Sequence, residues 1–513
     1  MGAGSRARSP WTVFSATSCG VVVVFLNVSG VNVALPTITR ALGASAGQAS
    51  WVLLSYMLLT TALILALGRL ADIVGRRPLY LTGFAVFTAA TTACALSPSA
   101  EVLIAARAVQ AVGAAALVTN TTPLLTDVFP GSSLGRALGL NATVAAVSQA
   151  AGPLLGGAAT ALLGWRGTFL LTLPLCVVGL VWSLLVLPAA RRPPGPRQPF
   201  DLAGAVLSAL ALAATLLALS PDALAATGLP GTGGPVAVAA LAVPAWAAFV
   251  LLQARRRHPL VDLRLVVHRV RAPLYAAVLL NAAAQYSVVV LASLVLQATG
   301  RRDALAAGLL VSPVAVGTTL AAVAAGHLVG RVSARALTTA GSALVLAGVV
   351  GLAVVLRPGS PYWLVGPALA AVGVGTGLFM TPSTSTLMLT VAAGSRGAAN
   401  GVRSALQNVG YLLSTALALG TATSGLAAGD RAAAYAGNLG TSGVADAFAT
   451  GVRTALTVLA VLALLALVAC WSLPRRRAQP PTQPPAQPPA QPPAQPPPAP
   501  PARPAPTAEG AHP

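Results

Sequence analysis

The chain has 513 residues, of which 56% are hydrophobic and only 8% are charged, and its formal net charge is +21. Soluble domains carry about 25% charged residues, so a soluble protein of this composition could not cover its own surface. The sequence therefore predicts an all-α polytopic membrane protein. The basic residues are all arginines, spread in short clusters between apolar runs. This distribution is typical of membrane topology signals and argues against nucleic acid as a partner.

Fourteen apolar runs are long enough to cross a bilayer, which takes about 20 residues. The first run follows Arg6 and Arg8 and is too long for a cleaved signal peptide, so we expect an uncleaved first helix. The predicted spans are 12–36, 50–68, 79–97, 102–125, 137–161, 168–188, 202–220, 236–254, 273–297, 306–329, 336–356, 362–387, 404–427 and 449–473.

The arginines also predict the orientation of these spans. With the N-terminus placed inside, most of them fall in the inside segments, as the positive-inside rule requires. We expect a multi-pass plasma-membrane protein with both termini in the cytoplasm. Its predicted parts are a cytoplasmic N-terminus (1–11), a six-helix bundle (12–188), a linker with two extra central helices (189–271), a second six-helix bundle (272–473) and a disordered, Pro-rich cytoplasmic tail (474–513). Two six-helix bundles around a midplane site are a transporter plan.

The first span contains the segment LNVSGVNVALP, from Leu26 to Pro36. This segment resembles the L-D-x-T-x-V-N-V-A-L-P signature of the fourteen-span drug:proton antiporters, which are multidrug and antibiotic efflux proteins of the major facilitator superfamily. The resemblance implies the major facilitator fold and places Asn27 and Asn32 in the proton or substrate pathway. Asn27 stands where the family has an acid, and an amide can form hydrogen bonds but cannot carry a proton.

The turn between the second and third spans reads GRLADIVGRRP at positions 68–78. Its glycines permit a tight turn, Asp72 can face the positive N-terminus of the third span, and two arginines hold the turn on the cytoplasmic side. The segment resembles the family's loop motif G-x-L-a-D-r-x-G-r-[kr]. We predict a gating role for Gly68, Asp72, Gly75, Arg76 and Arg77.

The fourth span carries an arginine inside an apolar run. Arg107 and Gln110 fall in a segment that resembles the family's R-x-x-Q-G-x-G, with Ala111 in place of glycine. A charge within the membrane is costly and marks function by default, and Gln110 lies one helical turn along the same face. We predict that both face the proton or substrate pathway. The alternative is that Arg107 extends to the outer interface.

The fifth span contains glycines and a proline whose spacing resembles the antiporter motif G-x8-G-x3-G-P-x2-G-G, with Ser148 at the second glycine. Small residues let neighbouring helices approach closely, and proline bends a helix. In the family the motif marks exporters, whereas the alternative is ordinary small-residue packing. The predicted motif residues are Gly139, Gly152, Pro153, Gly156 and Gly157.

Further polar side chains fall inside the predicted spans, where each either bonds to a neighbouring helix or lines a cavity. Two clusters favour the cavity, namely Gln285 with Tyr286 and Gln407 with Asn408 and Tyr411. None of the 10 acidic residues lies at the midpoint of a span. A coupled proton must then bind at Asp72, Glu101 or Asp127, and a neutral, zwitterionic or anionic substrate is favoured over a cation.

We predict a secondary exporter of small hydrophobic organic molecules, a monomer in the lipid bilayer, with the proton link that the resemblance implies. Because Asn27 cannot titrate, the alternative is an uncoupled facilitator or a transporter-derived sensor. The sequence has no HExxH, GxSxG or P-loop motif, so we expect neither an enzyme nor an ATP-driven pump. Cys19, Cys94, Cys176 and Cys470 form no CxxC pair, and we expect no metal and no cofactor.

Overall fold

The computed structural model describes residues 9–129, 131–188, 201–228, 234–256, 259–261, 263–300, 304–328, 331–357, 360–391, 396–439 and 442–474. The elements in these ranges are all α-helices. They are α1 (Pro10–Leu42), α2 (Ala46–Val74), α3 (Arg76–Leu96), α4 (Ala100–Val128), α5 (Gly131–Leu163), α6 (Gly167–Val186), α7 (Leu202–Leu219), α8 (Pro221–Ala225), α9 (Gly234–Arg255), α10 (Leu263–Val266), α11 (Arg271–Gln285), α12 (Val288–Gly300), α13 (Ala304–Leu328), α14 (Ala334–Val355), α15 (Tyr362–Leu389), α16 (Arg396–Thr423), α17 (Ala428–Tyr435) and α18 (Ser442–Trp471).

Within the described residues, 13 helical stretches are long and apolar enough to cross a membrane. One of them, Arg271–Gln297, combines α11 and α12. The remaining predicted span, 404–427, falls on α16, which has 28 residues but carries Arg403, Gln407 and Asn408. The all-helical membrane fold is thus confirmed, whereas fourteen crossings and cytoplasmic termini stay predictions.

The helix ends follow local sequence signals. In lipid the backbone must satisfy its own hydrogen bonds, so each apolar run becomes a helix. Ser45 and Gln48 form a capping box at the start of α2, each side chain accepting a hydrogen bond from the other residue's backbone N–H. Gly43 and Gly75 adopt φ values of 57° and 101°, which glycine tolerates best. These two glycines therefore allow the chain to turn from α1 into α2 and from α2 into α3.

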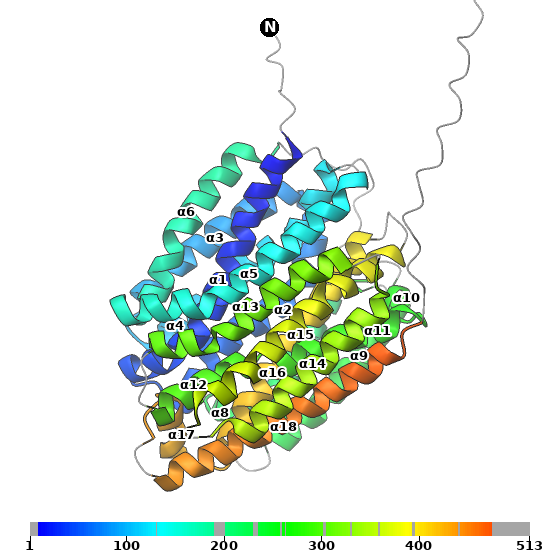
Figure 1. The fold of residues 1–513 in the computed structure, drawn as a ribbon. Helices are drawn as coiled ribbons and strands as arrows, with labels where there is room; N and C mark the ends of the chain where they lie inside the picture. Colours follow the sequence, from blue (N-terminus) through cyan, green and yellow to red (C-terminus); the bar gives the residue numbers. More distant parts are fainter. Residues whose placement is uncertain are drawn as a thin grey trace, which may run out of the picture.

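The long helices form two bundles and an extra pair (Figure 1). In the first half α1 packs on α5 and α6, while α2 and α3 pack on α4. In the second half α13 and α14 pack on α15, and α18 packs on α11 and α14. The halves meet where α5 contacts α13 and where α2 contacts α16. The extra helices α7 and α9 pack on each other, and α7 also contacts α2 and α16, so the pair covers one edge of the junction.

The two ends of the bundle differ. The motif end is the end that holds the α2–α3 turn at Gly75. The start of α1 and the end of α4 meet there, where the ring centroids of Trp11 and Phe129 lie 5.1 Å apart. The end of α18 also lies there, packing through Leu473 on Leu274 of α11. The opposite end, called the far end, holds α8 and α17.

The far end is closed by a buried hydrophobic cluster to which both halves contribute. Its members are almost inaccessible to solvent and come from helices of both halves, among them α1 and α2 on one side and α12, α16, α17 and α18 on the other. They include Val31, Leu35, Ile38, Leu53, Leu291, Val295, Leu419, Leu426, Tyr435 and Phe448. Because the cluster joins the halves, opening the far end requires separating these side chains.

A set of hydrogen-bonded polar side chains, called the Asp222 cluster, also holds the far end closed. Asp222 of α8 is 6% exposed and accepts hydrogen bonds from Arg431 Nη1 at 2.9 Å, Thr423 Oγ1 at 2.7 Å and the Tyr435 hydroxyl at 3.4 Å. Ser50 of α2 donates to the Tyr435 oxygen at 3.0 Å. Burial raises the pKa of Tyr435, so its hydroxyl keeps the proton that it donates. The cluster ties α8, the short helix between α7 and α9, to both halves.

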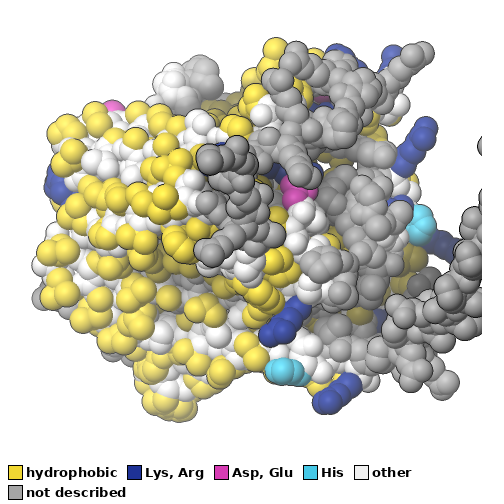
Figure 2. All heavy atoms as spheres, turned by 90° about the horizontal axis from the view of Figure 1, so that it is seen from above, with side chains coloured by type: hydrophobic (Ala, Val, Ile, Leu, Met, Phe, Trp, Pro, Cys, Tyr) yellow, Lys and Arg dark blue, Asp and Glu magenta, His cyan; other side chains and the backbone are white. Residues whose placement is uncertain are grey.

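The outer surface is that of a protein in lipid. Figure 2 shows hydrophobic side chains over a broad area of one side, with most of the visible arginines towards the other. Large exposed hydrophobic patches are rare on soluble proteins. On α6, for example, the exposed hydrophobic residues are Leu170, Leu175, Val177, Val178, Val181, Trp182, Leu184 and Leu185.

Candidate functional site

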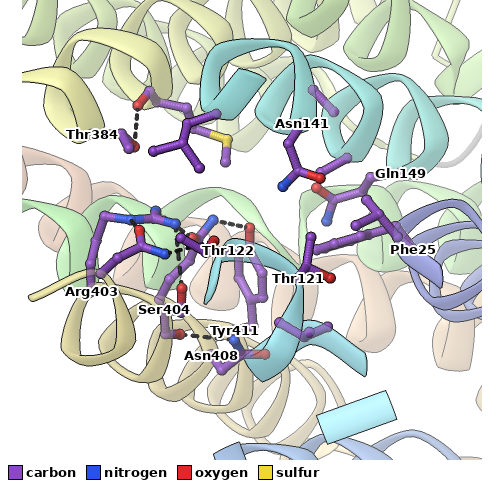
Figure 3. Close-up of a pocket in the computed structure, with 18 of the residues that line it drawn as sticks. Phe25, Thr121, Thr122, Asn141, Gln149, Thr384, Arg403, Ser404, Asn408 and Tyr411 are labelled. Carbon is purple, nitrogen blue, oxygen red and sulfur yellow. Dashed lines mark hydrogen bonds between the residues drawn. The ribbon is translucent and has the colours of Figure 1, made fainter. Parts of the chain in front are cut away.

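A cavity of about 960 Å3, which includes space open to solvent, lies between the halves in the part of the bundle nearer the motif end. Helices α1, α4 and α5 face α15 and α16 across it (Figure 3). Its lining combines apolar and neutral polar side chains with a single arginine. The lining residues are Val21, Phe25, Val118, Thr121, Thr122, Leu138, Asn141, Ala145, Ala146, Gln149, Met380, Thr384, Met388, Asn400, Arg403, Ser404, Gln407, Asn408 and Tyr411.

Two smaller cavities continue this space. One of about 520 Å3 shares Gln149 with the first cavity. Another of about 260 Å3 shares Arg403 and Gln407 with the first and Gln285 with the second. Because they share walls, we treat the three as one central cavity.

One face of α16 supplies a chain of polar contacts along the central cavity. Arg403 donates from Nε to Asn400 Oδ1 at 3.1 Å and from Nη1 to Gln407 Oε1 at 2.9 Å. Gln407 Nε2 donates to the Tyr411 hydroxyl at 2.6 Å. Asn400 Nδ2 donates to Thr122 Oγ1 of α4 at 3.1 Å and so crosses between the halves. Residues three and four apart share a helix face, which is why this spacing forms a continuous strip.

The structure brings six of the predicted pathway residues together. Tyr286, at the break between α11 and α12, stacks on Tyr411 of α16 with ring centroids 4.2 Å apart. The six residues that line the central cavity are Asn32, Gln285, Tyr286, Gln407, Asn408 and Tyr411.

Sequence reasoning missed several residues of the cavity wall. Arg403 precedes the predicted span 404–427, so the arginine pattern marks it only as a topology signal. Asn400 also lines the cavity without having been predicted there, and so does Gln149, a polar residue inside a span for which the sequence leaves packing and a cavity role equally open. The spacing of Asn400, Arg403, Gln407 and Tyr411 was the available signal, because it places all four on one face of a helix.

Arg107 lies inside the first bundle and lines none of the three cavities. Its side chain is 1% exposed. Arg107 Nη1 donates to Asn27 Oδ1 at 2.9 Å and to Gln110 Oε1 at 2.7 Å, and Nε donates to the Val52 carbonyl at 3.3 Å. The guanidinium also lies 4.2 Å from the ring centroid of Tyr56. The structure therefore places Arg107 and Gln110 in a buried network outside the three cavities, and their place in the proton or substrate pathway stays a prediction.

Asn27 is fully buried in the same network. Its amide oxygen accepts from Arg107, and its Nδ2 donates to Thr172 Oγ1 of α6 at 3.3 Å. The position that holds an acid in the resembling family thus supplies a neutral acceptor to a buried cation. The amide joins α1, α4 and α6 and is enclosed away from the central cavity.

The loop motif ties helix ends together at the motif end. Arg76 at the start of α3 forms an ion pair with Asp127 near the end of α4. Arg77 donates from Nη2 to the Leu184 carbonyl of α6 at 3.3 Å. Asp127 therefore lies in an interhelical contact and lines none of the three cavities. The side chain of Asp72 lies outside the described part of the structure.

Two glycines of the antiporter motif lie where α5 crosses α1 closely. A Cβ at Gly152 would overlap Ser29 Oγ, and a Cβ at Gly156 would lie 2.5 Å from the Cα of Gly30. Gly139, by contrast, has open space around its missing Cβ. Close approach at a crossing is the usual role of small residues in membrane helices.

Pro153 of the motif faces the second half. Pro153 lines the central cavity, and its carbonyl lies against Gly308 of α13. Gly157 is buried beside it. In the loop motif, a Cβ at Gly68 would lie 3.0 Å from Thr119 Cγ2 of α4, so this glycine also allows close helix packing.

Two helical bundles around a shared cavity define a membrane transporter. The chain belongs to the Major Facilitator Superfamily, whose family profile matches residues 17–415. The expected family and fold are thereby confirmed.

The chain is also similar to individual proteins. It is 31% identical over 411 residues to the multidrug resistance protein Stp of Mycobacterium tuberculosis (strain CDC 1551 / Oshkosh), which covers 80% of this chain and 75% of that protein. It is 32% identical over 422 residues to the methylenomycin A resistance protein of Streptomyces coelicolor (strain ATCC BAA-471 / A3(2) / M145), with coverage of 81% and 86%. Among solved structures, an auto-inhibited POT family peptide transporter matches with a TM-score of 0.60 and 18% identity, over 92% of this chain and 98% of that one.

Proposed function

We propose that this protein exports small organic molecules from the cytoplasm by alternating access. The observation that carries the proposal is the position of the central cavity. It lies between two bundles near the motif end, while a shared hydrophobic core closes the far end. A site between two such halves can load from one side and release to the other when the halves rock.

The cavity wall and the relatives support a small organic cargo. Phe25, Met380 and Met388 offer an apolar surface, and amide and hydroxyl groups between them can orient a ligand. Relatives at about one-third identity are named for multidrug resistance and for methylenomycin A resistance. Efflux of a drug or antibiotic is therefore the form of export that we propose.

We further propose that the proton gradient drives export, as the resemblance to drug:proton antiporters implies. The described wall of the central cavity contains no Asp or Glu, so the titrating group acts elsewhere. The candidates remain Asp72, Glu101 and Asp127, and we favour Asp127 because it links two helix ends through Arg76.

An uncoupled facilitator is the second candidate, and one observation favours it. The acid position of span one holds Asn27, which is buried against Arg107 and cannot exchange a proton. A transporter-derived sensor has less support, since only the Pro-rich tail favours it over a facilitator, and residues 475–513 lie outside the described part of the chain.

Transport into inverted membrane vesicles tests the proposal. Vesicles with the protein should accumulate a cargo dye, with fluorescein and rhodamine 6G as first probes, above vesicles without it. An uncoupler should abolish this accumulation, and Asp127→Asn should reduce it while downhill flux continues. Uncoupler-insensitive equilibration would favour the facilitator. No transport of either dye or of an antibiotic panel would contradict the exporter.

A further inference from the structure

Arg403 places a positive charge on the wall of the central cavity. The half-buried side chain lines two of the three cavities. Its hydrogen bonds go to neutral groups of its own helix, which are Asn400, Gln407 and, at 3.4 Å, Ser404 Oγ. These neighbours orient the guanidinium without neutralising it.

No carboxylate among the described residues balances this charge. The described lining of the central cavity holds neither Asp nor Glu. Ion pairs occur elsewhere in the described chain, and none includes Arg403. They are Arg76–Asp127, Arg256–Asp201 and Arg431–Asp222. A cation in a partly dehydrated cavity gains from an anion more than it would in water.

The other arginine of this region, Arg107, is not available to a ligand. It is 1% exposed, and its Nε and Nη1 donate to a backbone carbonyl, Asn27 and Gln110. The two arginines therefore differ in role. Arg107 is enclosed in the first bundle, whereas Arg403 faces the space between the bundles.

The surroundings of Arg403 indicate the rest of the ligand. A guanidinium presents a planar set of donors that fits a carboxylate or another oxyanion in bidentate fashion. Across the cavity, Asn141 and Gln149 of α5 offer neutral polar contacts (Figure 3). Phe25 and Met380 offer apolar contacts for the body of the molecule. This combination suits an amphipathic organic acid.

We propose that Arg403 binds the acidic group of an amphipathic organic anion, which makes small organic acids the preferred cargo. This proposal specifies the cargo of the proposed exporter, so the role of Arg403 in transport rests on the proposed function. Binding itself can be measured apart from transport.

Fluorescence anisotropy of the purified full chain in detergent tests the site. Fluorescein is the anionic probe, and rhodamine 6G, with the same three-ring core, is the cationic one. Arg403→Gln should weaken fluorescein binding about tenfold or more, since it removes a charged hydrogen-bond donor, and should leave rhodamine 6G within about twofold. Arg403→Lys should keep part of the affinity, because it keeps the charge but loses the planar fork.

The matched control is Arg335→Gln. Arg335 lies over the Trp471 ring, 5.1 Å from its centroid, and outside the central cavity. The Arg335→Gln variant should bind fluorescein and rhodamine 6G with the affinities of the parent. On the unaltered protein, benzoate should displace fluorescein and benzylamine should not, a comparison that needs no variant to fold.

Three results would overturn the anion site: no fluorescein binding by the parent, unchanged binding in Arg403→Gln, or equal loss of both dyes in that variant. Equal loss would mean that Arg403 only shapes the cavity. Selective fluorescein binding without transport in vesicles would instead support the anion site and refute the proposed export.

Discussion

Asn27 shows how one residue changes the electrostatics of a whole helix bundle. The family has an acid at this position, and from the sequence alone an Asn27→Asp variant is expected to favour cationic substrates. The structure changes that expectation, because a carboxylate there would meet Arg107 and be neutralised by it. That Asn27 departs from the family pattern can be read from the sequence. Its partner, 80 positions away, is known only from how α1 and α4 pack.

At this scale we predict that Asn27→Leu destabilises the protein. The variant removes an acceptor from the buried guanidinium of Arg107, which costs about 1–3 kcal/mol. The thermal unfolding midpoint in detergent should fall. Asn141→Leu is the matched control, since Asn141 Oδ1 makes no hydrogen bond in the described structure. Equal midpoints for the two variants would contradict the network.

At the scale of elements, the crossing of α1 and α5 links the antiporter motif to movement. The spacing of the motif can be read from the sequence, but the sequence does not show which of its glycines lie at the close helix crossing. The structure distinguishes them, because Gly156 contacts the backbone of Gly30 while Gly139 faces open space. The polar face of α16 could be predicted only in part. The sequence assigns Gln407, Asn408 and Tyr411 to a cavity. It does not assign Arg403 there, because an arginine near the end of a span fits a topology signal equally well.

We expect Gly156→Ala to reduce transport about tenfold or more while the protein still inserts. The added methyl group overpacks the crossing at a cost of about 1–3 kcal/mol, and about 1.4 kcal/mol corresponds to a factor of ten. Gly139→Ala should transport normally. Vesicle uptake, scaled to the amount of protein in the membrane, measures both. Full activity of Gly156→Ala would show that the crossing tolerates expansion.

The Asp222 cluster gives a second prediction about elements. Asp222→Asn weakens the bond to Arg431 and should make the far end open more often, by about tenfold for a loss of about 1.4 kcal/mol. Ala49→Cys, at a buried position of α2 in the far-end core, would then react faster with an impermeant maleimide added outside. Asp446→Asn, at an exposed acid near the start of α18, is the control. If Asp222→Asn left the labelling rate of Ala49→Cys unchanged, the Asp222 cluster would not contribute to closing the far end.

At the scale of the whole molecule, the apolar runs predicted the fold because lipid forces each of them to be helical. All fourteen predicted spans fall on helices, including 404–427 on α16. The break between α11 and α12 at Tyr286 was not predicted, since nothing in a uniformly apolar run marks it. The cavity was not predictable in detail either, because its wall depends on how two distant bundles meet.

The orientation of the molecule is testable with reporter fusions. A fusion after Thr227, beside α8, should be active as alkaline phosphatase, which folds only outside. A fusion after Pro474 should fluoresce as a green fluorescent protein, which folds inside. The expectation follows from the arginine-rich segments and from the motif end holding both the start of α1 and the end of α18. Phosphatase activity at the C-terminal fusion would reverse the assignment.

The closed far end also bears on the energy supply of the cell. A transporter waiting for cargo is a potential leak, because any continuous water path through it would discharge the membrane potential. Here a hydrophobic cluster and a partly buried ion pair close that path while the cavity stays open to cargo on the other side. An idle copy of the protein should therefore cost the cell no ion gradient, so a cell could keep many copies in its membrane before any toxic molecule arrives.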